Sequence, residues 1–156
     1  MKISKKGFNL ICEFEGFSAK SYKCPAGIWT IGWGTTFYPT GKSVGPNETC
    51  TKEQADIWLL HEINEKSAYL NIILESNNIV LNQNEYDALV SITYNCGSGI
   101  LNKNRSLGEA LLSKDKSKIS EAFLLYCKVT LLGIKTTSKG LLARRQAERR
   151  LFLEPL

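Results

Sequence analysis

The chain has 156 residues, of which 43% are apolar and 22% are charged, with a formal net charge of +5 and a pI of about 8.9. This composition indicates a globular chain with a core and excludes an intrinsically disordered or membrane-spanning one. The length suits one domain or two small lobes that share a core. The surplus of positive charge would favour binding to nucleic acid, to an acidic membrane surface or to the anionic bacterial wall. The alternative is that it is ordinary surface charge.

The cysteines are five in number and widely and irregularly spaced, and the chain has a single histidine, His61. Because no Cys-x-x-Cys pair occurs, we expect no metal site, and we expect no cofactor. An odd number of cysteines predicts reduced thiols in a chain made in a cytosol, with one or two disulfides after export left open. The cysteines are Cys12, Cys24, Cys50, Cys96 and Cys127.

The N-terminal sequence is Met-Lys-Ile-Ser-Lys-Lys-Gly-Phe, and no apolar stretch of signal-peptide length follows it. The longest uncharged apolar runs elsewhere are far shorter than a membrane span. We therefore expect synthesis in the host cytoplasm, without a secretion signal or a membrane anchor.

The first predicted element is a short helix. Ser4 would cap it, and Phe8, Ile11 and Cys12 would form its apolar face. Gly16 would end it, since a glycine often follows the last periodic residue of a helix.

Residues 17–45 have a different character, with many glycines and prolines and the β-forming run Ile28–Ile31. They predict a small meander of short strands joined by tight turns. The turns are predicted at Pro25–Gly27, Pro39–Gly41 and Gly45–Asn47.

Helical patterns fill the rest of the chain. Thr51-Lys-Glu-Gln54 has the form of a capping box and opens a long helix that would reach about residue 75. Asn82-Gln-Asn-Glu85 opens a second helix that would stop at Gly97. Three further helices are predicted from Ser106, over 117–128 and over 139–152. The order of elements predicts an α+β fold with a small β-lobe, a long connecting helix and a helical lobe.

Glu15 is a candidate catalytic acid because it ends the first helix where the chain turns into the β-meander. Cys24 lies nine positions later and Thr30 six positions after that, so a short hairpin could bring both back towards Glu15. A carboxyl group covered by Phe14 and Trp29 would have a raised pKa, which suits the general acid of glycoside hydrolysis. On these residues alone the evidence for catalysis is weak, and an ordinary exposed glutamate at a helix end is the simpler interpretation.

Three stretches then resemble the phage-type lysozymes, glycoside hydrolase family 24. Phe14-Glu15-Gly16 and the segment Tyr22–Gly34 match the family pattern of Glu, eight residues, Asp or Cys, five residues and Thr. The segments Ala88–Gly97 and Gly140–Glu148 are similar to the family's two later conserved stretches. The matches follow the family's order from about residue 10 to 150.

The resemblance implies a lysozyme-like fold as a single domain over residues 1–156. Its β-lobe would span about 13–50, its helical lobe about 51–156 with the first helix packed on it, and a cleft would lie between them. It implies an endolysin that hydrolyses, with inversion, the β-1,4 bond between N-acetylmuramic acid and N-acetylglucosamine in peptidoglycan and so lyses bacteria. Glu15 would be the general acid and Thr30 would hold the attacking water.

Cys24 would occupy the position at which many family members have an aspartate. A thiol can replace the carboxylate only when it is ionised, and its reference pKa is about 8.5. A thiolate, a polar placeholder and a small buried hydrophobe remain open as its role, and its oxidation could switch the enzyme off.

The resemblance also implies a substrate-binding set. Tyr94 and Asn95 would line the sugar cleft, although they could simply form a helix C-terminus. Arg144 or Arg145 would approach Glu15 as an ion-pair partner, and the alternative is a solvated basic face. The implied partner is the peptidoglycan glycan strand, with no nucleic acid and no stable membrane insertion. Release is expected to depend on a holin, followed by action on the wall as a monomer.

Other functions remain open. Cys24 and His61 could form a peptidase that cuts wall peptides. The basic last helix could make the chain a non-catalytic wall- or polyanion-binding module. A lytic transglycosylase would cut the same bond but leave an anhydro product.

Overall fold

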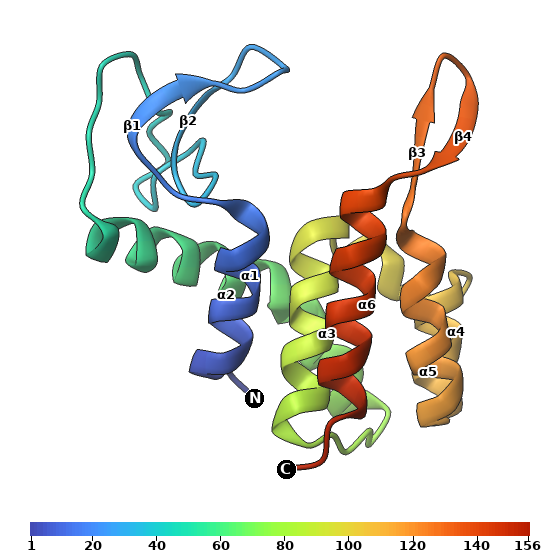
Figure 1. Cartoon of the computed structure of the whole chain (residues 1–156). Helices are drawn as coiled ribbons and strands as arrows, with labels where there is room; N and C mark the ends of the chain where they lie inside the picture. Colours follow the sequence, from blue (N-terminus) through green and yellow to red (C-terminus); the bar gives the residue numbers. More distant parts are fainter. The chain divides into compact units, whose positions relative to one another are not determined.

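A computed structural model describes residues 1–156, except for the side chain of Leu131. The predicted α+β class is confirmed, since six α-helices, two 3₁₀ helices and two small antiparallel sheets occur in this described part (Figure 1). In chain order the elements are α1 (Lys5–Glu15), β1 (Ser18–Lys23), β2 (Trp29–Gly32), α2 (Lys52–Ser76), α3 (Gln83–Cys96), η1 (Ser98–Leu101), α4 (Ser106–Ser113), α5 (Lys116–Ala122), η2 (Phe123–Tyr126), β3 (Lys128–Leu131), β4 (Ile134–Thr137) and α6 (Lys139–Leu153).

The chain divides into two compact units. One, the β unit, contains Asn9–Glu65, and the other, the helical unit, contains Met1–Phe8 and Lys66–Leu156. The division falls inside α1 and inside α2. In the described part of the chain, no helix is both long enough and apolar enough to cross a bilayer.

The β unit is built around the hairpin of β1 and β2. These strands pair antiparallel, with Tyr22 opposite Thr30 and Lys23 opposite Trp29. The turn between them closes through the Cys24 N–H, which donates to the Ile28 carbonyl oxygen at 3.0 Å. All three predicted turns are confirmed, but the predicted meander reduces to this hairpin and isolated bridges. The core of the unit consists mainly of Ile11, Ile31, Ala55, Leu59 and Ile63.

Capping side chains start the helices at the predicted positions. The Ser4 hydroxyl accepts from the Gly7 N–H at 3.3 Å at the start of α1. Thr51 and Gln54 form the predicted capping box of α2, because each side chain accepts from the other residue's backbone N–H. Asn82 caps α3 in the same reciprocal way.

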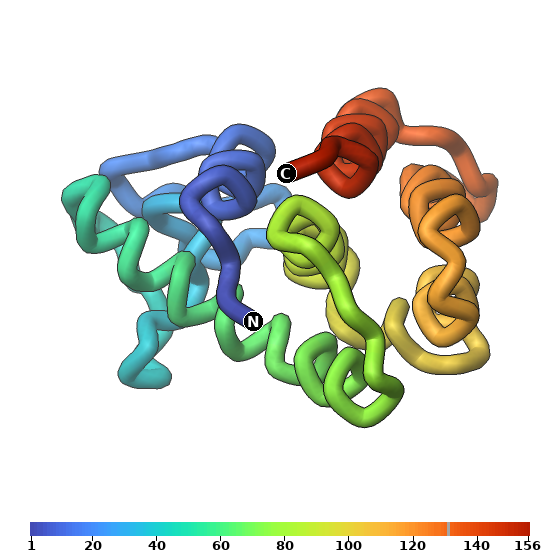
Figure 2. Tube along the Cα trace, turned by 90° about the horizontal axis from the view of Figure 1, so that it is seen from below, coloured from blue at the N-terminus to red at the C-terminus, as the bar shows by residue number. Residues whose placement is uncertain are grey.

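The helical unit is organised around α3, which is buried from Asn84 to Tyr94. In Figure 2, the second half of α2 and helices α4, α5 and α6 flank α3 within this unit. The Phe123 and Phe152 rings, with centroids 5.6 Å apart, join η2 to α6. Helix α6 also packs along α3, which brings its side chains against that helix.

One predicted boundary is wrong, and one element was not predicted. The helix expected over 117–128 ends at Ala122 and continues as the 3₁₀ turn η2 to Tyr126. The hairpin of β3 and β4 follows, where no strand was expected. Its sequence, Lys-Val-Thr-Leu-Leu-Gly-Ile-Lys-Thr-Thr, is rich in β-branched residues around a glycine turn, which favours a hairpin over a helix.

Candidate active site

Glu15 lies at the C-terminal end of α1 and is half-buried. The helix stops there because Gly16 adopts φ 71°, and its N–H donates to the Cys12 carbonyl oxygen at 3.2 Å. A Cβ atom placed on Gly34 would lie 3.5 Å from Oε2 of Glu15. The carboxylate therefore faces the turn that follows β2, and the missing side chain of Gly34 leaves space beside it.

Cys24 and Thr30 lie together in the β1–β2 hairpin. Thr30 is only 4% exposed, and its hydroxyl donates to the Ile28 carbonyl oxygen at 3.1 Å. Hydrogen bonds from the backbone of Ile28 and then of Ala26 lower the pKa of the Cys24 thiol, and a hydrogen bond from Thr30 lowers it further. Cys24 is partly exposed, so it is not a small buried hydrophobe. These hydrogen bonds stabilise the thiolate form of Cys24 relative to an ordinary cysteine.

A second thiol in the β unit has the opposite character. Burial and then the negative charge of Asp56 raise the pKa of Cys12 to about 11. Asp56 also accepts a hydrogen bond of 2.6 Å from Nε1 of Trp33, whose ring lies 5.1 Å from that of Phe17. Cys12, Asp56 and Trp33 are therefore packing residues, and the pKa of Cys12 is shifted in the opposite direction to that of Cys24.

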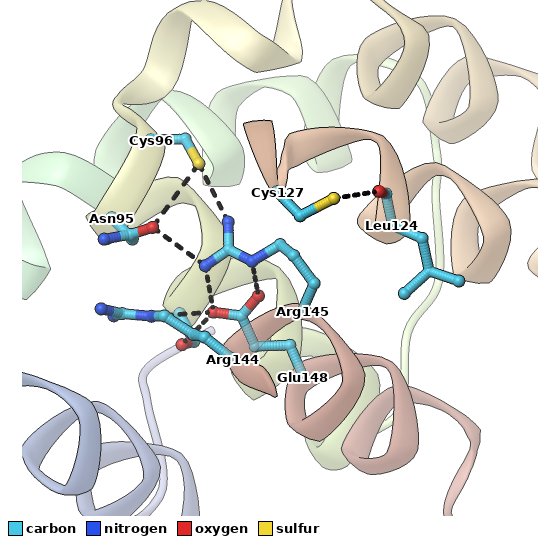
Figure 3. A network of polar contacts seen from close by, with 8 residues as sticks. Asn95, Cys96, Leu124, Cys127, Arg144, Arg145 and Glu148 are labelled. Carbon is cyan, nitrogen blue, oxygen red and sulfur yellow. Dashed lines mark hydrogen bonds and ion pairs between the residues drawn. The ribbon is translucent and has the colours of Figure 1, made fainter. Parts of the chain in front are cut away.

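The helical unit contains a buried ion-pair network on α6 (Figure 3). Glu148 is completely buried, with its Oε2 2.8 Å from Nε of Arg145 and its Oε1 2.9 Å from Nη2 of the same arginine. The Ser91 hydroxyl donates to Oε1 at 2.7 Å, and Nε of Arg144 lies 3.3 Å from it. Burial raises the pKa of Glu148, and the positive charge of Arg145 opposes that rise.

Arg145 connects this network to the C-terminal end of α3. Its Nη2 donates to Oδ1 of Asn95 at 3.0 Å, and its Nη1 lies 2.9 Å from Sγ of Cys96. Arg145 is completely buried, whereas Asn95 is exposed. Tyr94 is buried, with Nζ of Lys66 4.4 Å from the centre of its ring. Arg145 thus fixes the side-chain amide of Asn95, which is exposed to solvent.

The burial of Arg144 and Arg145 excludes one alternative, in which both belong to a solvated basic face. Glu148 was not predicted as the partner of Arg145. The sequence did contain a usable indication, because Arg145 and Glu148 are three positions apart and hence on the same face of a helix.

The structure also bears on two other kinds of site, a metal site and a peptidase site formed by Cys24 and His61. In the described part of the chain, no cluster of three or more His, Cys, Asp or Glu side chains could hold a metal ion. His61 is exposed on α2, where its Nδ1 lies 3.5 Å from Oε2 of Glu65.

Comparison with known proteins gives consistent matches along the chain. The family model described as "Phage lysozyme" matches residues 12–148. An endolysin of Acyrthosiphon pisum secondary endosymbiont phage 1 is 36% identical over 97% of this chain and 98% of its own. The solved structure of an endolysin from Escherichia coli O157:H7 phage FAHEc1 has a TM-score of 0.89 at 36% identity, with 99% of this chain and 94% of that chain covered.

Two further similar proteins have descriptions other than endolysin alone. The muramidase domain of SpmX from Asticaccaulis excentricus superposes with a TM-score of 0.87 at 28% identity, with 99% of both chains covered. A protein of Pseudomonas phage phiKMV, 32% identical over 93% of this chain and 84% of its own, is described as a SAR-endolysin.

Proposed function

Because the chain belongs to the phage lysozyme family, we propose that it is an endolysin that cleaves peptidoglycan. The bond cut is the β-1,4 link between N-acetylmuramic acid and N-acetylglucosamine, and the cut is a hydrolysis with inversion. The observation that carries the proposal is the joint arrangement of Glu15 at the end of α1 and of Cys24 with Thr30 in the adjoining hairpin.

Glu15 acts as the general acid. It protonates the oxygen of the leaving sugar while the bond to the anomeric carbon breaks. Gly34 supports this position of Glu15, because its backbone adopts φ 101°, which side-chain-bearing residues rarely do, and a Cβ there would only touch the carboxylate at 3.5 Å.

Thr30 and Cys24 act on the attacking water. An inverting glycosidase needs a second group on the opposite face of the sugar to orient or deprotonate a water molecule. The Thr30 hydroxyl carries one proton, which it gives either to the Ile28 carbonyl oxygen or to the Cys24 sulfur. The Thr30 hydroxyl oxygen accepts a hydrogen bond from the water and orients it, and the Cys24 thiolate takes the proton that the water loses as its oxygen bonds to the anomeric carbon, so the two residues act as one unit.

Tyr94, Asn95 and Arg144 bind the glycan strand in this proposal. Asn95 is the exposed member, and its amide can hydrogen-bond to sugar hydroxyl or acetamido groups. Arg145, which is completely buried, acts as a positioning residue that fixes the Asn95 amide.

Product analysis on purified peptidoglycan tests the reaction. Glu15→Gln should lower the release of reducing ends at least about 100-fold, since this is the scale of general acid catalysis. Glu13→Gln is the matched control, because Glu13 is an exposed carboxylate on the same helix. Full activity of a folded Glu15→Gln variant would refute the proposal.

Mass spectrometry of the same products separates the alternatives. Reducing N-acetylmuramic acid ends indicate hydrolysis, anhydro ends a transglycosylase, and saturable wall binding without new ends a binding module. Cut peptides would indicate a peptidase, and in that case His61→Ala should abolish activity. Cys24→Ser reports how much of the rate depends on an ionisable group at this position.

The route to the wall is part of the proposal. We expect the chain to be made in the cytoplasm, released as a monomer through a holin pore, and then to act on the wall. Lysis after expression with a holin, and none without one, would support this route. Lysis without a holin would indicate a release mechanism of another kind, as the name of the phiKMV relative suggests for that protein.

A further inference from the structure

The β3–β4 hairpin of the helical unit is a two-faced ribbon. The strands pair with Lys128 opposite Thr137, Val129 opposite Thr136 and Thr130 opposite Lys135. Because residues directly opposite each other point to the same face, both lysines lie on one face with Thr130 and Thr137. Val129, Thr136 and Ile134 point to the other face.

Both the hairpin and its turn are unusually exposed. Every residue of β4 is exposed, Ile134 is 68% exposed, and Leu132 at the tip is 103% exposed. Leu132 and Gly133 form the two-residue turn with φ angles of 48° and 78°. Asparagine and glycine are the usual residues at such positions, and a leucine is strained there. An apolar side chain is therefore held in water at a position where it also costs backbone energy.

The hairpin lies in a segment without acidic residues. From Ala122 to Ala147 the sequence has no aspartate or glutamate. Lys128 and Lys135 are diagonal cross-strand neighbours in the ribbon, and their Cβ atoms are roughly 7 Å apart. Neither has an ion-pair partner among the described residues. Because both side chains start from the same face at this spacing, their ammonium groups can reach a single ligand that carries two negative charges.

The hairpin lies at the same end of the helical unit as Asn95. Its base closes where the Ser138 N–H donates to the Cys127 carbonyl oxygen at 2.9 Å, and α6 begins at the next residue. Arg145, about 10 Å further along α6 by helical rise, contacts Asn95 at the end of α3. Figure 1 shows the hairpin projecting beyond this end of α3 and α6.

We propose that the β3–β4 hairpin binds the stem peptide attached to N-acetylmuramic acid, an inference that rests on the proposed function. Stem peptides are short, extended and rich in free carboxylates and methyl side chains. The ribbon is roughly 13 Å long, which matches about four extended peptide residues. Lys128 and Lys135 bind peptide carboxylates, Leu132 and Ile134 cover peptide methyl groups, and a free strand edge offers backbone hydrogen bonds. The lysines share one face instead of surrounding the apolar tip, which favours a peptide over a lipid surface.

Kinetics on two forms of one substrate test the proposal. The forms are peptidoglycan with its stem peptides and the same glycan strands after an amidase has removed them. The double variant Lys128→Gln/Lys135→Gln should raise KM about five- to tenfold on the peptide-bearing form and less than about twofold on the stripped form. Lys5→Gln/Lys103→Gln removes two exposed lysines elsewhere and should change neither KM. Equal losses on both forms, or no loss, would overturn the proposal.

A binding measurement makes the proposal independent of catalysis. In an NMR titration with N-acetylmuramoyl tetrapeptide, the amides of Lys128–Thr137 should shift in the wild type, and the shifts should weaken in the double variant. If the enzyme releases no reducing ends yet these shifts occur, the proposed function fails while the peptide site stands. If the amides of Lys128–Thr137 shift with phosphatidylglycerol vesicles but not with the peptide, the peptide site is refuted and a membrane contact is indicated instead.

Discussion

The two contrasting thiols of the β unit give the sharpest test of the site chemistry. Iodoacetamide reacts with thiolates, so it should modify Cys24, whose pKa is lowered by backbone hydrogen bonds, well before Cys12. Both residues are partly exposed, and the pH dependence of each rate separates the effect of ionisation from that of access. The modified Cys24 should no longer support wall hydrolysis.

The expected ratio follows from the pKa of Cys12, which burial and Asp56 raise to about 11. A thiol with a pKa of 9.0 or below has at least about 100 times more thiolate than Cys12 near neutral pH. The thiolate of the weaker acid is intrinsically more nucleophilic, which returns a factor of about eight over two pKa units. Cys24 should therefore react at least about tenfold faster than Cys12.

Peptide mapping by mass spectrometry after timed alkylation between about pH 6 and pH 9 measures both rates. The rate at Cys24 should rise with pH and level off first, because a lowered pKa shifts ionisation to lower pH. Thr30→Val removes one donor to the sulfur and should move that profile to higher pH. Equal rates at Cys24 and Cys12, or a profile unaffected by Thr30→Val, would refute the assignment of Cys24 as the ionisable partner of Thr30.

Three further predictions concern stability. Glu148→Gln should lower the free energy of unfolding by about 3 kcal/mol, because it leaves Arg145 buried without its counter-charge, and urea titration measures this. Gly7→Ala should cost about 1–3 kcal/mol in the same assay, since its Cβ would lie 2.6 Å from Cβ and Cγ of the buried Asp87. Leu132→Asn should instead stabilise by roughly 1 kcal/mol by relieving a left-handed leucine, visible as a higher melting temperature. A loss below about 0.5 kcal/mol for the first two, or a lower melting temperature for the third, would contradict these accounts.

The starts of the helices were predictable because their determinants are local. The reciprocal bonds of Thr51 with Gln54, and of Asn82 with Glu85, connect residues three positions apart. A sequence window contains both partners. The end of α5 was not predictable in this way, because apolar periodicity continues through η2 and does not distinguish an α-helix from a 3₁₀ turn.

The site shows the same distinction between local and distant determinants. The spacing of Cys24 and Thr30 predicts that they lie close together, since a short antiparallel hairpin brings such positions near each other. The contact of Arg145 with Asn95 joins residues 50 positions apart, and it depends on how α6 packs on α3. No local pattern contains that packing, so the sequence indicated both residues without indicating that one holds the other.

The buried network on α6 is poorly explained by stability alone. Removing Glu148 and Arg145 from water costs several kcal/mol per ion, and apolar side chains of similar volume would often be as stable or more so. An apolar replacement could not donate to the Asn95 oxygen, however, and a flexible surface side chain could not fix that amide in one orientation. We infer that the ion pair is retained because it holds Asn95, at a cost in stability that an apolar core would avoid.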